Sequence, residues 1–151
     1  MVFRNQPFRS FLIYIPFIFI EMATPVAFSA YPSTTKGYDS GSIVQFDAIV
    51  TNSGSSYNPD FGVFQCPSNG IYLFSISLLT ETGRFMGGAI MQEGLNLLSS
   101  RSEGENLDQG AVVVVTECLE LETVWVECTE ANGELFGDRR SSFSGILITP
   151  Y

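Results

Sequence analysis

Histidine is absent from this chain of 151 residues, which removes the side chain most often used as a general base and as a metal ligand. Any catalysis would have to rest on carboxylates. Basic residues are also scarce, because seven Lys and Arg stand against 16 Asp and Glu for a formal net charge of −9. A charge of this sign repels nucleic acid and anionic membranes. The sequence therefore predicts no nucleic-acid partner, and a polyanionic ligand would need a local basic patch.

Cysteine is limited to Cys66, Cys118 and Cys128, with no C-x-x-C spacing among them. In a secreted chain an odd number leaves at least one thiol free or bonded between molecules. A zinc site is not indicated, because three cysteines without histidine are an improbable ligand set. Cys118 and Cys128 lie on neighbouring candidate strands with the parity of apolar residues, so we expect buried thiols. A disulfide between these two is the alternative.

The N-terminus places Arg4 and Arg9 before the apolar run 11–20 (FLIYIPFIFI). This order is typical of a secretory signal peptide. The run is too short for a bilayer-spanning helix, which needs about 20 apolar residues, and Pro16 interrupts it. We predict a signal peptide over residues 1–25 and a secreted domain over residues 26–151, without stable membrane insertion. The alternatives are a signal anchor that keeps the chain at the membrane and a core element of a cytosolic protein.

Beyond residue 31, short apolar runs alternate with turns rich in Gly, Pro, Ser and Asn, and no 3.6-residue period stands out. Such a pattern favours an all-β antiparallel sandwich, a jelly roll or a barrel. A loop is expected over 32–41. The candidate strands span residues 43–50, 62–66, 71–80, 88–92, 111–119, 123–128 and 143–149.

Three of these strands are apolar on both faces: residues 111–115 (AVVVV), 123–126 (TVWV) and 70–74 (GIYLF). An antiparallel strand with one face in water should alternate apolar and polar residues. Because the chain is too short to supply a further layer, association between protomers is the economical explanation. The alternative is that the edges and loops of a monomer cover these strands.

The aromatic and turn residues between 46 and 74 carry a resemblance. Their spacing is similar to that of the globular head of the complement component C1q family, and the segments VAFSA (26–30), LFGD (135–138) and SSFSGILI (141–148) resemble further parts of it. The resemblance covers residues 26–151 and assigns scaffold positions, the aromatics as buried anchors and the glycines at turns or close approaches. These positions are Phe46, Asn52, Tyr57, Phe64, Gly70, Tyr72, Phe74, Phe136, Gly137, Phe143 and Gly145.

The resemblance implies a ten-stranded antiparallel jelly roll like that of tumour necrosis factor, assembled as a tight homotrimer or hetero-oligomer. The sequence departs from the family pattern at Ile76, Phe136 and Leu121-Glu122. Because loops carry function and diverge first, these departures bear on ligand specificity. No collagen-like repeat or heptad precedes the domain, so we expect a stand-alone secreted head.

Carboxylate pairs such as Glu103 with Glu105 or Glu120 with Glu122 are solvated surface in most proteins, so we predict no enzyme. The resemblance makes calcium a candidate cofactor, since some members bind it through loop oxygens. Asp138 and Glu134 are the predicted ligands, with Asp60 and Asp108 as further oxygen donors, and the alternative is no cofactor.

Arg139 and Arg140 form the one basic pair after residue 25. Arginine binds sulfate, phosphate and carboxylate groups through two parallel hydrogen bonds, so we predict a ligand site there, with a solubilising pair as the alternative. The resemblance implies an extracellular, non-enzymatic trimer that recognises microbial or host surface carbohydrate, lipid or protein in innate immunity. An extracellular structural or cytokine-like signalling trimer is the alternative.

Overall fold

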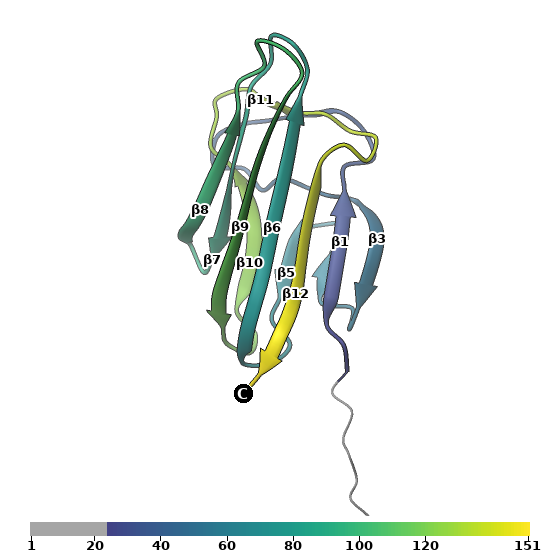
Figure 1. Cartoon of the computed structure of the whole chain (residues 1–151), viewed down its shortest axis with the longest axis vertical. Helices are drawn as coiled ribbons and strands as arrows, with labels where there is room; N and C mark the ends of the chain where they lie inside the picture. Colours follow the sequence, from purple (N-terminus) through teal and green to yellow (C-terminus); the bar gives the residue numbers. More distant parts are fainter. Residues whose placement is uncertain (1–23) are drawn as a thin grey trace, which may run out of the picture.

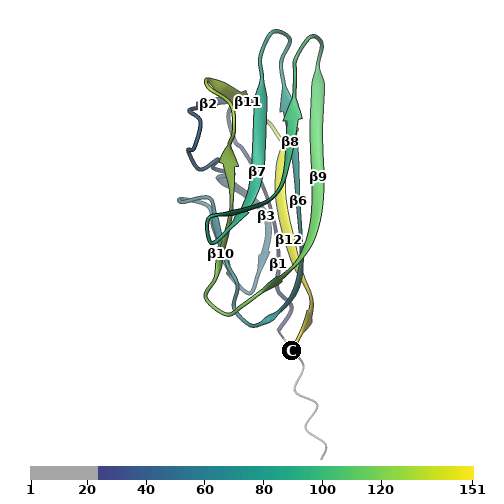
Figure 2. The ribbon, with the colours of Figure 1, turned by 90° about the vertical axis from the view of Figure 1, so that its left-hand side faces the viewer.

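The computed structural model describes residues 24–151. The predicted signal segment therefore lies outside the described residues, apart from its last two positions. Within this range, twelve β-strands build a sandwich of two layers, and no helix is long and apolar enough to cross a membrane (Figure 1). Figure 2 shows the sandwich from its edge, with β7 and β10 in one layer and β6 and β9 in the other.

Two five-stranded antiparallel sheets supply the ten strands of the predicted jelly roll. The first sheet has the order β3 (Ala48–Ser53), β1 (Ala27–Tyr31), β12 (Ser142–Pro150), β6 (Gly70–Thr80) and β9 (Asp108–Cys118). The second has the order β4 (Tyr57–Asn58), β5 (Val63–Gln65), β10 (Thr123–Cys128), β7 (Met86–Gln92) and β8 (Leu95–Ser102). A further ribbon pairs β11 (Gly133–Leu135) with β2 (Lys36–Tyr38).

The core between the sheets is built from the aromatic anchors. Five of them are fully buried at 0% exposure: Phe46, Phe64, Tyr72, Phe74 and Phe143. Burying one such side chain contributes about 1.5–3 kcal/mol. Gly145 on β12 sits among them, and a Cβ there would lie 2.5 Å from the ring of Phe28 and 2.6 Å from that of Phe74. The position therefore has to be glycine for the rings to meet.

Some strand predictions need correction. The predicted strand 43–50 is observed at Ala48–Ser53, because residues 43–46 run beside β10 with only the isolated bridge from Ile43 to Glu127. The strand β8 begins within a predicted turn and continues through a segment for which no strand was predicted. It is a largely exposed edge strand without regular alternation, which is the usual signal for a strand. The ribbon strand β2 lies inside the predicted loop 32–41.

The cysteine arrangement also differs from the alternative considered above. Cys66 is bonded to Cys118, and Cys128 is a buried free thiol, so a Cys118–Cys128 disulfide is wrong. The physical reason is the topology: β9 pairs with β6 in one sheet and β10 pairs with β5 and β7 in the other, so these two strands are not a hairpin. The prediction that Cys118 and Cys128 are buried is confirmed.

The outer face of the β3-β1-β12-β6-β9 sheet accounts for two of the three segments that are apolar on both sides, 70–74 on β6 and 111–115 on β9, whereas 123–126 lies on β10 of the other sheet. Val113 and Val115 are each 57% exposed there, so the sandwich does not cover them from within. Leu73 lies beside Val115 and beside Ile146 in the strand register, which makes an apolar row across three strands. Toward the β12 start at Ser142 the next rows are uncharged as well: Val113, Ser75 and Ser144, then Ala111, Ser77 and Ser142. On the other side, the next row places Glu117 beside Ile71.

Candidate functional site

The Arg139–Arg140 pair lies in the loop 136–141, which connects β11 to β12 at the end of the sandwich away from the C-terminus (Figure 1). The strand register brings the β6–β7 and β8–β9 connections to the same end, since Thr80 pairs with Asp108 and Ser77 with Ser142. We call residues 32–35, 81–85, 103–107 and 136–141 the upper loop end.

Hydrogen bonds hold the 136–141 loop at both of its ends. The Phe136 amide donates to the Leu79 carbonyl at 2.9 Å, and the Gly137 amide donates to Thr35 Oγ1 at 3.1 Å. The Ser141 hydroxyl donates to the Phe136 carbonyl at 3.1 Å and accepts from the Leu79 amide at 3.0 Å. A Cβ at Gly137 would collide with the backbone of Thr34 and Thr35, so this close approach requires glycine.

Between these anchors the backbone takes a disfavoured conformation. Asp138 and Arg139 have φ of 59° and 62°, in the left-handed region that costs roughly 1–2 kcal/mol for a residue with a side chain. Strain of this kind is a reason to look for function at a loop.

Each guanidinium lies over an aromatic ring. Arg139 is 5.0 Å from the centre of the Tyr31 ring, and Arg140 is 5.3 Å from that of Phe136. Neither makes an ion pair with an acidic residue of the described range, whereas Arg84 pairs with Glu134 at 3.4 Å and Arg101 with Glu130 at 3.2 Å. The guanidinium donors are therefore available to an anion. Sequence reasoning missed Tyr31, because more than a hundred residues separate it from Arg139.

The predicted calcium ligands do not form a site within one chain. Glu134 is engaged by Arg84, and the Asp108 carboxylate accepts the amides of Glu103 at 2.8 Å and Gln109 at 2.9 Å. Asp60 lies in the β4–β5 turn, away from the upper loop end. In residues 24–151 no three Asp, Glu or Cys side chains gather as a metal ion requires. These residues therefore do not complete a calcium site within one chain, and calcium binding stays a prediction.

Titratable groups with a displaced pKa serve the fold. Burial disfavours the charged form of Asp47, but its hydrogen bonds from the Ser33 amide (2.8 Å) and hydroxyl (2.5 Å) outweigh this and hold its pKa below the usual range. Burial raises the pKa of Tyr57, whose hydroxyl donates to the Phe46 carbonyl at 3.1 Å. Burial also raises the pKa of the Cys128 thiol, which makes it a poor nucleophile.

The predicted scaffold residue Asn52 has a specific role. Its side-chain amide donates to the Tyr57 carbonyl at 2.8 Å and accepts from the Tyr57 amide at 3.2 Å. These two bonds replace the neighbouring strand that the edge strand β4 lacks. Of the acidic residues Glu120 and Glu122, Glu122 accepts the Leu119 amide at 2.9 Å and Gln92 Nε2 at 2.8 Å in the β9–β10 turn.

Comparison with known proteins agrees with this architecture. A family model described as C1q domain matches residues 27–148. The chain belongs to the C1q domain family. Among solved structures, the globular domain of a zebrafish complement 1qA protein superposes with a TM-score of 0.71 at 18% identity, over 83% of this chain and 99% of that chain. Murine APRIL superposes with a TM-score of 0.65 at 12% identity, over 82% and 99%.

Curated C1q-domain relatives are larger proteins. Human multimerin-2 is 32% identical over 85% of this chain and 13% of its own length, and the mouse collagen alpha-1(X) chain is 30% identical over 87% and 19%. One of the mouse complement C1q subcomponent chains is 28% identical over 73% of this chain and 47% of its own length. The chain thus spans half or less of these relatives.

Proposed function

We propose that this C1q domain is a secreted, non-enzymatic homotrimer that recognises anionic groups on microbial or host surfaces through its upper loop end, in innate immunity. The observation that carries the proposal is the Arg139–Arg140 pair, two guanidinium groups that lie over aromatic rings and have no acidic partner in residues 24–151. Guanidinium groups bind phosphate, sulfate and carboxylate through paired hydrogen bonds. Because the rest of the chain is negatively charged, anions should be attracted to this pair and repelled elsewhere on the surface.

The outer face of the β3-β1-β12-β6-β9 sheet supports the trimer. Its central rows are uncharged, and Val113, Val115 and Ile146 expose 57%, 57% and 47% of their surface. Contiguous exposed apolar surface of this kind marks association sites. Three protomers would present three copies of the arginine pair, so weak single contacts with a repetitive surface would add up.

Secretion is supported by the N-terminal basic and apolar sequence and by the Cys66–Cys118 disulfide, since stable disulfides persist in oxidising compartments. A non-enzymatic role is supported by the two carboxyl groups whose pKa departs from its ordinary value. Asp47 and Glu93 have lowered pKa values, the opposite of what a general acid needs, and each binds neighbouring backbone.

An extracellular structural or signalling trimer is the second candidate. The likeness to a collagen chain favours the structural form, and the fold shared with APRIL favours the signalling form. Such a protein would use the same scaffold but would bind a cell-surface protein in place of a microbial surface.

The test is binding to immobilised lipopolysaccharide, peptidoglycan and whole bacteria at several salt concentrations. Removing both guanidinium groups with Arg139→Ala/Arg140→Ala should weaken binding to the anionic ligand by about tenfold or more and flatten its salt dependence. The matched control is Arg84→Ala/Arg101→Ala, which removes the same charge from the same end but from ion-paired side chains.

Unchanged affinity in the Arg139→Ala/Arg140→Ala variant would refute the arginine site. Failure across the whole microbial panel, together with tight binding to a cell-surface protein, would favour the structural or signalling trimer.

A further inference from the structure

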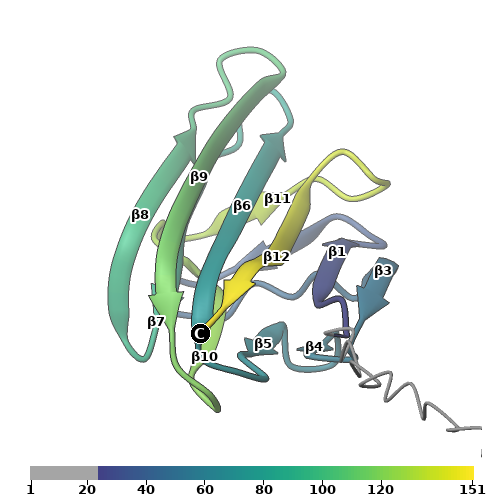
Figure 3. The same cartoon turned by 60° about the horizontal axis from the view of Figure 1, so that its bottom comes forward.

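A second candidate site lies along the β4–β5 edge of the second sheet, apart from the upper loop end. A hollow of about 750 Å³ is bounded by the turn before β4, the β4–β5 turn and the β9–β10 connection. Figure 3 shows β4 and β5 at the edge of the molecule. Small-ligand sites in proteins have volumes of roughly 300–1,000 Å³, so the hollow is of the right size for one.

Two apolar side chains stand on its rim. Phe61 is 68% exposed and Leu121 is 67% exposed. Leu121 has φ of 73°, in the left-handed region where glycine fits freely and leucine does not. Because the side chain is exposed, the core gains little from a leucine in this strained position. Contact with a ligand would explain why leucine stands where glycine would fold more easily.

The polar side chains in the hollow keep unused hydrogen-bonding groups. Asn58 Oδ1 accepts the amides of Asp60 at 3.0 Å and Phe61 at 3.3 Å, which leaves its Nδ2 without an acceptor among the described residues. Gln65 Nε2 donates to the Leu121 carbonyl at 3.3 Å, which leaves its Oε1 without a donor in the same range. The Asp60 carboxylate makes no hydrogen bond or ion pair with another residue between 24 and 151.

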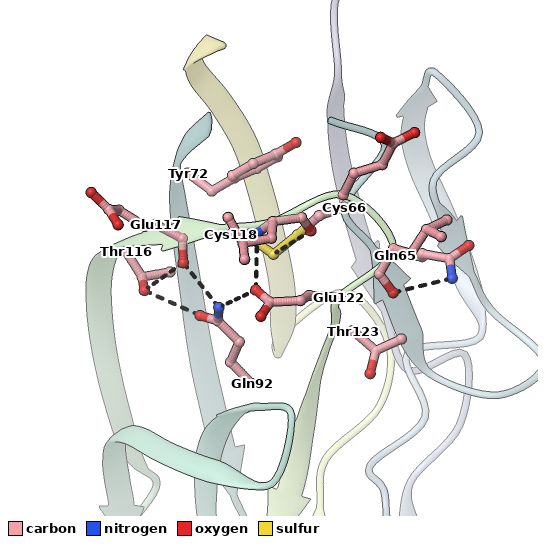
Figure 4. The surroundings of a disulfide bond; sticks show 12 residues. Gln65, Cys66, Tyr72, Gln92, Thr116, Glu117, Cys118, Glu122 and Thr123 are labelled. Atoms are coloured by element: carbon pink, nitrogen blue, oxygen red, sulfur yellow. Dashed lines mark hydrogen bonds between the residues drawn. A yellow bond between two sulfur atoms is a disulfide. The ribbon is translucent and has the colours of Figure 1, made fainter. Parts of the chain in front are cut away.

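The walls of the hollow are held rigidly. Cys66, on one wall, is tied to the end of β9 by its disulfide with Cys118 (Figure 4). Tyr57, on another, is stacked on Phe28 at 4.5 Å and is fixed through its backbone by the Asn52 amide. A site that is already ordered spends little of its binding free energy on becoming ordered.

We propose that this hollow binds a neutral hexose unit of a glycan. Sugar hydroxyl groups both donate and accept, so they match the Asn58 donor and the Gln65 and Asp60 acceptors. The apolar face of a pyranose ring can lie against the Phe61 ring, as aromatic side chains offer a flat apolar surface. Among residues 24–151, Asp60 is the only charged side chain that lines the hollow, which disfavours sialylated or sulfated sugars. This site is therefore distinct in location and charge from the Arg139–Arg140 pair.

The test uses the full chain and a set of neutral polysaccharides, mannan, dextran and galactan, with D-mannose, D-glucose and D-galactose as free competitors. We expect binding to at least one of them, with an affinity that does not change between low and high salt. Phe61→Ala should weaken it by about tenfold, the size expected for loss of an aromatic contact. Leu121→Gly should weaken it several-fold while the melting temperature stays the same or rises, because the strained backbone is relieved.

The matched control is Leu107→Ala, which removes a 63% exposed leucine at the upper loop end and should leave binding intact. Arg139→Ala/Arg140→Ala should also leave neutral-sugar binding intact, so failure of this site and failure of the arginine site are separable. Absence of binding across the neutral panel would overturn the proposal. So would preference for sialylated or sulfated glycans, or equal affinity in the Phe61→Ala and wild-type proteins.

Discussion

Removing the Cys66–Cys118 disulfide with Cys66→Ala/Cys118→Ala should lower the free energy of unfolding by about 4 kcal/mol. The bond closes a loop with a sequence separation of 52 residues. The chain-entropy relation for a loop of that length gives about 4 kcal/mol at 25 °C, which is the freedom that the unfolded chain regains. At roughly 2–8 °C of melting temperature for each kcal/mol, the expected fall is about 8–32 °C.

Urea unfolding followed by fluorescence would measure this change, because Trp125 is the one tryptophan and lies half-buried on β10. Wild-type and variant proteins have to be compared at one protein concentration, since assembly contributes to apparent stability. Reductant should bring the wild-type protein down to the level of the double variant and should not affect the double variant itself.

Cys128→Ala is the control, because it truncates a buried cysteine that carries no disulfide. It should cost much less than the double substitution and should keep the sensitivity to reductant. If the double variant stays within about 1 kcal/mol of wild type, the loop-entropy reasoning is refuted. If Cys128→Ala alone abolishes the reductant effect, the disulfide pairing is refuted.

Three other predictions concern core packing, stability at low pH and calcium binding. Gly145→Ala should lower the free energy of unfolding by about 1–3 kcal/mol through overpacking, and an unchanged urea midpoint would contradict the close approach seen at β12. Because the folded-state pKa of Asp47 lies below its unfolded value of 3.8, its contribution is present above that pH and is lost as pH falls through the folded pKa. The stability difference between wild type and Asp47→Asn should therefore shrink on acidification below about pH 4, and a difference that grows would refute the Ser33 interaction. If Asp138 and Glu134 bind calcium between protomers, 1 mM CaCl₂ should raise the melting temperature, since this concentration is on the order of the dissociation constants of the weakest extracellular calcium sites. Asp138→Asn should abolish the rise. A wild-type melting temperature that does not rise would refute calcium binding.

The framework of the fold was largely predictable from local signals. The aromatic anchors between Phe46 and Phe74 alternate with turn residues, and each of them is buried in the core. The edge strand β8 could not be predicted, because its burial does not alternate and an extra residue at Leu97 breaks its register with β7.

The disulfide and the surroundings of the Arg139–Arg140 pair depend on contacts between residues that are far apart in the sequence. Sequence gives no rule for which of three cysteines pair, and only the pairing of Gly70 with Cys118 across β6 and β9 brings Cys66 near its partner. In the same way, Arg139 and Arg140 stand out as a basic pair, but the contact of Arg139 with Tyr31 exists only after β1 and β12 have paired. The sequence thus identifies the cysteines and the arginine pair, and the strand topology decides which residues lie beside them.

The outer face of the β3-β1-β12-β6-β9 sheet offers the most direct test, because the trimeric assembly proposed for this C1q domain rests on it. Sedimentation equilibrium should give three times the chain mass for the wild-type protein, unchanged by reductant. Val113→Glu places a charge in the centre of the uncharged rows and should give a folded monomer. A wild-type protein that sediments as a folded monomer at every concentration would contradict trimeric recognition, even though the fold would stand.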